Sequence, residues 1–176
     1  LVLRKDWESA EDIVGTVLRR ARQRAPGRPL RARLEPGLPL LYCDALLLTQ
    51  LLDNLVDNAL NHTPADSPIE VLVRLEAPNP ASATPRVVLA VRDVGPGVPP
   101  AWRERVFDVF QRGADTPVEG QARRGAGVGL AVCRAIARAH GGELRLRARG
   151  HGGSSFECLL PCPPAPDQTG TEVSAS

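Results

Sequence analysis

Apolar residues recur at helical spacing along the stretch between Asp44 and Pro64. One side of this predicted helix is apolar and carries Leu51, Leu52, Leu55, Val56, Ala59 and Leu60. The opposite side carries short amides and a carboxylate at i, i+3, i+4 and i+7, namely Asn54, Asp57, Asn58 and Asn61. Asn and Asp each cost roughly 0.5 kcal/mol more than good helix formers in a helix interior. This polar stripe is therefore either a solvated surface or one that binds a ligand.

Three further stretches are predicted to be helical, over about residues 9–24, 100–110 and 127–140. Ser9 and Asp12 resemble a capping box at the start of the first helix. A proline at the start of the second suits the first turn of a helix, and Gly141 and Gly142 are typical of a helix end. Asp44 is expected to cap the helix that carries the polar stripe.

Alternation of apolar and polar residues predicts five strands, over residues 29–36, 69–75, 86–92, 143–150 and 154–161. The last two are expected to pair as a hairpin across the turn at 151–153. Each strand has one apolar face, which favours helices on one side of a mixed, mostly antiparallel sheet. We therefore predict an α+β fold, a two-layer sandwich. The polar segment 111–126 is expected to be a mobile loop, and residues 162–176 a disordered tail.

Length and composition limit the possibilities further. The chain has 176 residues, 43% hydrophobic and 3% aromatic, so we expect one domain over residues 1–161 with a core of Leu, Val and Ala. The formal net charge of +2 is too small to indicate nucleic acid or an anionic membrane as a partner. No apolar run could span a bilayer, and no signal peptide is visible. The absence of Met, even at position 1, suggests a piece of a longer protein.

The four cysteines, Cys43, Cys133, Cys158 and Cys162, form no C-x-x-C pair. With only three histidines, none suitably spaced, a zinc site is not expected. Reduced, buried thiols in a cytosolic domain are the expectation. Cys162 is the exception, because it lies near the tail and could be exposed.

A carboxylate and two glycines follow the strand predicted at 86–92, as Asp93-x-Gly95-x-Gly97. A carboxylate at a strand end can accept a hydrogen bond from an exocyclic amine, and the glycines let the backbone approach a flat ligand closely. An ordinary Asp-Gly turn is the alternative interpretation of this segment. A calcium loop is excluded because the later oxygen ligands and the closing Glu are missing.

Three glycines, Gly125, Gly127 and Gly129, lie where the last predicted helix begins. Free amides at a helix N-terminus suit a phosphate group, and Arg123 and Arg124 could add charge-assisted contacts. The segment is no P-loop, because Gly-Lys-Ser/Thr is absent, and no dinucleotide fingerprint, because a polar loop rather than a strand precedes it. A flexible hinge that leads into a helix is the other interpretation.

The order of these segments is more specific than any one of them. Asn-x-x-Asp-Asn on a helix, Asp-x-Gly-x-Gly after a strand, Phe107-x-x-Phe110 and Gly-x-Gly-x-Gly-Leu at a helix start follow one another. Over roughly residues 1–161 the chain resembles the ATP-binding domain of sensor histidine kinases, with its N, G1, F and G2 boxes. Three segments further resemble the potassium-response (Kdp-type) sensor kinases: "KDWESAEDIVGTVL", "LPLLYCDALLLTQLLDNLVDNALNHTP" and "GVGLAVCRAIARAHGG".

The resemblance implies a Bergerat-type α/β sandwich that binds ATP and Mg²⁺ beneath a flexible lid. Asn58 would bind Mg²⁺ through its side-chain oxygen, and Asn54 would lie one turn away near the phosphates. Asp57 matches the acidic position beside the metal-binding Asn, where it would help to position the transfer, although we do not assign it as a base. Arg112 matches a basic position after the F box, within reach of a phosphate.

The base and the lid have their own residues in this resemblance. Asp93 would accept from the adenine amino group, above a pocket floor formed by Gly95 and Gly97. The lid glycines at 125, 127 and 129, followed by Leu130, would present amides to the phosphates. Many members carry Lys at the position of Asn61 and an aromatic at that of His62. These departures affect the expected affinity for ATP rather than the family assignment, although His62 could still stack on the adenine side.

No histidine here lies in the setting of the family's phosphoacceptor: His62, His140 and His151 are placed otherwise, and His140 resembles a structural helix end. We therefore expect a monomeric fragment that transfers the γ-phosphoryl of ATP to a histidine on a separate dimerisation domain, and from there to a response regulator. The parent would be a homodimer in the inner membrane, with this domain in the cytoplasm. A regulatory nucleotide-binding module and an anti-sigma-type serine kinase are the alternatives.

Overall fold

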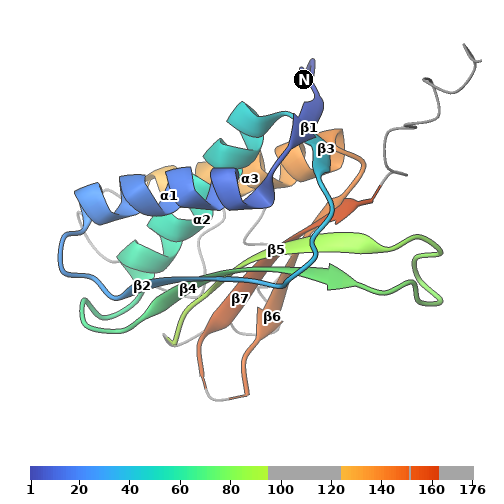
Figure 1. The fold of residues 1–176 in the computed structure, drawn as a ribbon. Coiled ribbons are helices and arrows are strands. Elements are labelled where there is room, and N and C mark those ends of the chain that lie inside the picture. Colours follow the sequence, from blue (N-terminus) through green and yellow to red (C-terminus); the bar gives the residue numbers. More distant parts are fainter. Residues whose placement is uncertain (95–123, 151, 163–176) are drawn as a thin grey trace, which may run out of the picture.

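In the part of the chain that the structure describes, three helices cover one face of a five-stranded sheet (Figure 1). The computed structural model describes residues 1–94, 124–150 and 152–162. The helices among these residues are α1 (Ala10–Arg24), α2 (Ala45–His62) and α3 (Arg124–Ala139). The expected two-layer α+β sandwich is confirmed, since the apolar sides of all three helices pack on the same face of the sheet.

The sheet is mixed and mostly antiparallel, as the strand pattern predicts. Its strands are β2 (Leu30–Leu34), β4 (Ile69–Glu76), β5 (Arg86–Arg92), β6 (Glu143–Ala148) and β7 (Ser154–Pro161). They lie in the order β2-β4-β5-β7-β6, with β2 parallel to β4 and every other neighbouring pair antiparallel. The predicted hairpin corresponds to β6 and β7.

A second, two-stranded sheet was not predicted. It consists of β1 (Asp6–Glu8) and β3 (Leu41–Cys43), which pair antiparallel. The rings of Trp7 and Tyr42 lie on paired residues, with centroids 5.1 Å apart. Strands of three residues are too short to show an alternating pattern, so their pairing depends on tertiary contacts.

The core lies between the helices and the inner face of the sheet. Val, Leu and Ile from alternate strand positions meet the apolar sides of α1, α2 and α3 there, including Val71, Val73, Val87, Leu89, Val91, Leu51, Leu55 and Ile136. The core is therefore built mainly from aliphatic side chains, as expected from the composition. Burial of a full aliphatic side chain stabilises the fold by about 1.5–3 kcal/mol.

Arg and Glu side chains occupy the outer face of the sheet. Glu157 is the most buried of them, with 1% of its side chain exposed. Arg145 donates two hydrogen bonds to its Oε1, at 2.6 and 2.9 Å, and Arg147 lies at 3.6 Å from the same oxygen. The aliphatic stems of such arginines can cover apolar surface while their guanidinium groups stay in water.

Asp44 caps α2 as predicted and connects three parts of the fold. Its carboxylate accepts from the N–H of Leu47 at 3.1 Å and from that of Arg4 at 2.9 Å, and the Arg4 bond is the main cause that lowers the pKa of Asp44 below its usual value. The backbone N–H of Asp44 donates to Nε2 of His140 at 3.0 Å. Nδ1 of that neutral ring is therefore the protonated nitrogen and donates to the Ile136 carbonyl at 2.8 Å. His140 is the structural helix end that the sequence indicates.

The capping box expected at Ser9 is not formed. Ser9 is the N-cap residue of α1, but its side chain makes no cap hydrogen bond. Its carbonyl instead accepts from the N–H of Ile13 at 3.2 Å. The predicted start of the helix is confirmed, while the side-chain bond inferred from Ser9 and Asp12 is wrong.

The cysteines are free thiols, as predicted. Cys43, Cys133 and Cys158 are buried, and Cys162 is half-buried rather than exposed. Burial raises the pKa of both Cys43 and Cys133 to about 12, so these thiols stay protonated at neutral pH. Within the described ranges, no group of three or more His, Cys, Asp or Glu side chains could hold a metal ion.

Some expectations concern residues outside the described ranges. These are the short helix at 100–110, the loop at 111–123, the pair Phe107 and Phe110, and the tail at 163–176. None of the three described helices combines the length and the hydropathy that a membrane crossing requires.

Gly15 provides a test of helix energetics on α1. It lies in the middle of the helix, and a Cβ at this position would meet no atom within 4 Å. We expect Gly15→Ala to raise the free energy of unfolding by roughly 0.5–1 kcal/mol, because alanine loses less backbone entropy in a helix. Urea unfolding followed by circular dichroism measures this change. A loss of stability would show that the space beside Gly15 is occupied in solution.

Candidate functional site

The polar stripe of α2 is not uniformly solvated. Asn54 and Asn58 are half-buried, whereas Asn61 and His62, at the C-terminal end of the helix, are exposed. A Cβ at Gly129 of α3 would lie 3.9 Å from Cγ of Asn54, which is ordinary van der Waals contact. The second turn of α3 therefore lies against α2 at Asn54, the first residue of the stripe.

Asn54 also contacts α3 one turn further along that helix. Its side chain hydrogen-bonds the thiol of Cys133, and that thiol also contacts the Leu51 carbonyl at 3.4 Å. Leu130, predicted to bind the cofactor, is buried in the core with 6% of its surface exposed. Its side chain anchors the N-terminal part of α3 on the core next to Gly129.

Asp57 lies on the side of the stripe that faces α1. Its carboxylate pairs with Arg24 at 2.7 Å, and one turn earlier Asp53 pairs with Arg20 at 2.8 Å. Arg20 and Arg24 are spaced i, i+4, as are Asp53 and Asp57, so the two pairs form one ladder between the helices. The exposed Arg24–Asp57 pair contributes about 0–1 kcal/mol, whereas Asp53 is half-buried. Asp53 was not predicted from the sequence to lie at the site. The pairing of Asp57 with Arg24 could not be predicted from the pattern of α2 alone, because Arg24 belongs to α1.

Asp93 is fixed where β5 ends. It is buried, with 6% of its surface exposed, and its Oδ1 accepts from the N–H of Ser154 at 3.1 Å. Its N–H donates to the Ser154 carbonyl at 3.0 Å, and its own carbonyl accepts from Nη1 of Arg149 at 2.8 Å. A Cβ at Gly153 would lie 2.1 Å from the Asp93 carbonyl oxygen. Ser154, Arg149 and Gly153 were not predicted as site residues, because the turn was interpreted only as a hairpin.

The glycine-rich segment begins its helix earlier than predicted. The helix was expected from about Gly127, with a loop through 126, but α3 starts at Arg124 and places Gly125 and Gly127 in its first turn. The first amides of a helix have no intrahelical partner, so they can still bind an anion. Gly95, Gly97 and Arg112 lie outside the described residues.

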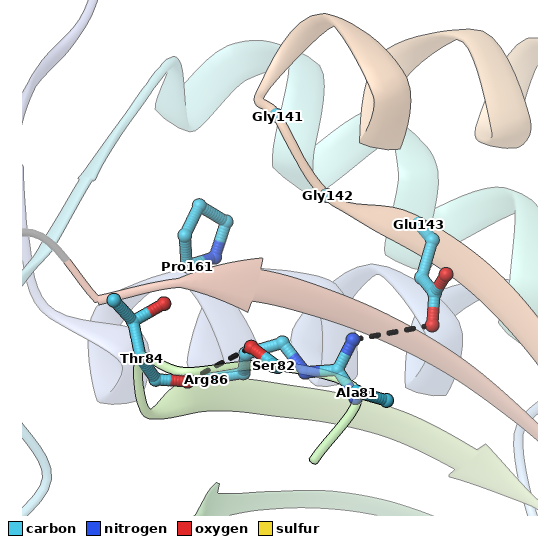
Figure 2. Close-up of a pocket in the computed structure, with 8 residues that line it drawn as sticks. All are labelled: Ala81, Ser82, Thr84, Arg86, Gly141, Gly142, Glu143 and Pro161. Atoms are coloured by element: carbon cyan, nitrogen blue, oxygen red, sulfur yellow. Dashed lines mark hydrogen bonds and ion pairs between the residues drawn. The ribbon is translucent and has the colours of Figure 1, made fainter. Parts of the chain in front are cut away.

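A pocket of about 220 Å³ lies at the opposite end of β5 from Asp93 (Figure 2). Its lining consists of Ala81, Ser82, Thr84, Arg86, Gly141, Gly142, Glu143 and Pro161. Arg86, the cation of this pocket, is paired with Glu143 at 3.2 Å and with Glu76 at 2.6 Å. None of the predicted site residues that the structure describes lines this pocket, and its cation is neutralised, so we do not place the nucleotide there.

Comparison with known proteins identifies the family. The family model described as histidine kinase-, DNA gyrase B- and HSP90-like ATPase matches residues 43–164. The chain is 35% identical over 167 residues to the sensor protein KdpD of Escherichia coli strain K12, covering 94% of this chain and 17% of that protein. It is 32% identical to the adaptive-response sensory kinase SasA of Trichormus variabilis, covering 83% of this chain and 34% of that protein. The chain thus spans between about a sixth and a third of these curated relatives.

Solved structures show the same fold. A mycobacterial sensor histidine kinase, MprB, superposes with a TM-score of 0.70 at 25% identity, over 91% of this chain and 97% of that one. Full-length ShkA, solved in complex with AMPPNP, gives a TM-score of 0.71 at 25% identity, over 92% of this chain and 32% of that one. The chain belongs to the histidine kinase-, DNA gyrase B- and HSP90-like ATPase family, as an ATP-binding catalytic domain of the sensor histidine kinase type.

Proposed function

We propose that this domain binds ATP together with Mg²⁺ and transfers the γ-phosphoryl group to a histidine on a separate dimerisation domain. The observation that carries the proposal is the close packing of α3 on Asn54 of α2: its side chain hydrogen-bonds the thiol of Cys133, and a Cβ at Gly129 would lie 3.9 Å from its Cγ. This packing places the N-terminal part of α3 beside the first amide of the stripe, so a metal-bound phosphate chain would find side-chain oxygens on α2 and backbone amides at the start of α3.

The residues present fit a magnesium ion held mainly by water and phosphate. Mg²⁺ prefers oxygen ligands, keeps several waters and needs few protein ligands. Asn58 is half-buried one turn after Asn54, and its carboxamide oxygen would serve as the protein ligand. Mg²⁺ would neutralise charge that develops on the phosphates during transfer. Asn54, the amides of the α3 start and Arg112 would then position the phosphate chain.

Asp93 would select the base. Its carboxylate is buried and held in place by the Ser154 N–H, so its orientation is set before any ligand arrives. A carboxylate accepts hydrogen bonds only, and adenine offers an amino donor where guanine has a carbonyl acceptor. Gly95 and Gly97 would form the floor of this base pocket, and His62 would lie beside the base.

The reaction itself requires positioning more than activation. A neutral imidazole nitrogen of the partner domain attacks the γ-phosphorus, the bond to the β–γ bridging oxygen breaks, and ADP leaves. Electrostatic stabilisation and alignment supply most of the rate. Asp57 would help to position the transfer, as a carboxylate that pairs with Arg24 of α1 through one of its two oxygens.

Similarity to KdpD supports a narrower proposal, potassium-response signalling in the parent protein. The parent would be a homodimeric sensor kinase of the inner membrane, with a response regulator as its downstream partner. The AMPPNP complex of ShkA supports nucleotide binding by this fold. The comparisons lend no support to a purely regulatory module or to an anti-sigma-type serine kinase.

Asp93→Asn tests the base assignment. The asparagine amide can rotate a donor toward the base, so we expect the ratio of ATP to GTP affinity to fall by roughly 10-fold or more. Calorimetry with each nucleotide in the presence of Mg²⁺ measures this ratio. Asp66→Asn, at an exposed aspartate, is the matched control and should leave it unchanged. An unaltered ratio in the Asp93 variant would refute the role in base selection.

A further inference from the structure

The turn between β6 and β7, together with the first residue of β7, makes three contacts with Asp93. Ser154 donates its N–H to the Asp93 carboxylate, and Gly153 packs so closely that a Cβ would lie 2.1 Å from the Asp93 carbonyl oxygen. The third contact is the guanidinium of Arg149, whose Nη1 donates to that same carbonyl oxygen at 2.8 Å. Arg149 is half-buried and lies 56 positions away from Asp93 in the sequence.

The Arg149 side chain is not needed to close the turn. Backbone bonds do that: the Arg149 N–H donates to the Gly153 carbonyl at 3.3 Å, and the Gly152 N–H donates to the Arg149 carbonyl at 3.2 Å. Gly152 and Gly153 also supply the positive φ values of the turn, 93° and 89°. The guanidinium is therefore free to serve the contact with Asp93, and we expect the backbone of the hairpin to stay intact when the side chain is removed beyond Cβ.

The carbonyl that Arg149 holds belongs to the peptide plane between Asp93 and Val94, where the chain leaves β5. The N–H of Asp93 donates to the Ser154 carbonyl at 3.0 Å, so this bond and the Arg149 bond together hold the two peptide groups that flank the Asp93 Cα, from which the carboxylate extends. A hydrogen bond requires its heavy atoms within about 2.7–3.2 Å, so a small rotation here weakens a bond to a ligand amine. A bond from a charged donor resists such a rotation more than a neutral one does.

We propose that Arg149 is a positioning residue for base selection, which acts through the Asp93 carbonyl and makes no contact with the nucleotide. The inference rests on the proposed role of Asp93. Because guanine has an acceptor where adenine has its amino group, a well-oriented carboxylate favours ATP and disfavours GTP. Loss of the orientation therefore lowers ATP affinity selectively, while loss of a phosphate contact would lower both affinities.

The test measures the dissociation constants of ATP and GTP by calorimetry, with Mg²⁺, for the 176-residue chain and its variants. We expect Arg149→Ala to weaken ATP binding about 10-fold and GTP binding less than about 2-fold. Arg149→Lys, which keeps a charged donor, should recover most of the ATP preference. Arg147→Ala removes the same charge two residues earlier, where the side chain is 55% exposed and pairs with Glu157, and should leave the ratio unchanged.

Two results for a folded Arg149→Ala protein would overturn the inference. One is an equal loss of ATP and GTP affinity, and the other is an unchanged ratio of ATP to GTP affinity. Thermal unfolding checks that the variant is folded. Asp93→Asn, measured in parallel, distinguishes a failure of the role proposed for Arg149 from a failure of the role proposed for Asp93. A lowered ratio for Asp93→Asn with an unchanged ratio for Arg149→Ala refutes the role of Arg149 alone. A wild-type chain without preference for ATP refutes the base pocket and the role of Arg149 with it.

Discussion

Replacement of Asn58 by alanine is expected to weaken Mg²⁺-dependent ATP binding by roughly 100-fold, because the metal loses a protein oxygen ligand. The half-buried side chain lies on the polar side of α2, opposite the leucines that anchor the helix in the core. Alanine also favours helix more than asparagine does, so the free energy of unfolding should stay within about 0.5 kcal/mol of the wild-type value. Calorimetry with and without Mg²⁺, together with urea unfolding, measures both quantities.

Asn61→Ala is the matched control for this prediction. Asn61 is the same residue type on the same stripe, but it is exposed near the end of α2. If the stripe were merely solvated, the two variants would behave alike. Transfer of labelled phosphate to an isolated dimerisation domain should likewise be lost in Asn58→Ala and retained in Asn61→Ala. Unchanged Mg²⁺-dependent affinity in the Asn58 variant would remove the metal assignment.

Local patterns determined much of what could be predicted. The structure confirms features that depend on a few neighbouring residues. These are the apolar face of α2, its Asp44 cap and the alternation in β4, β5, β6 and β7. The positions of His140 and the buried cysteines also follow from local signals. Such features are visible in one sequence because periodicity and capping are properties of single elements.

The features that the sequence did not predict depend on contacts between residues that are far apart in the chain. The Arg24–Asp57 pair joins two helices, and neither side chain is unusual in its own helix. The contact of Arg149 with Asp93 depends on the pairing of β5 with β7, which places the β6–β7 turn beside the end of β5. The start of α3 was placed too late because glycine disfavours helix interiors, and packing of residues such as Leu130 overrides this weak preference.

Gly142→Ala is expected to be the most destabilising of the substitutions considered, at about 3 kcal/mol or more. Gly142 lies between α3 and β6, and a Cβ there would fall 2.0 Å from the backbone carbonyl oxygen of Leu159. Because the clash is with backbone in β7, a strand paired on both sides, it cannot be relieved by a side-chain rotation. The melting temperature should fall by roughly 6–12 °C for a domain of this size.

Gly150→Ala separates this steric effect from a general effect of removing glycine. A Cβ at Gly150 would meet no atom within 4 Å, and the residue is exposed in the turn after β6. The free energy of unfolding of the Gly150→Ala protein should differ from the wild-type value by less than about 0.5 kcal/mol. Thermal unfolding of the two variants side by side provides the measurement, and equal melting temperatures would mean that β7 does not pass as close to Gly142 in solution. The N–H of Gly142 donates to the Ala137 carbonyl at 2.9 Å, so a shift of this residue would also loosen the end of α3 that carries His140.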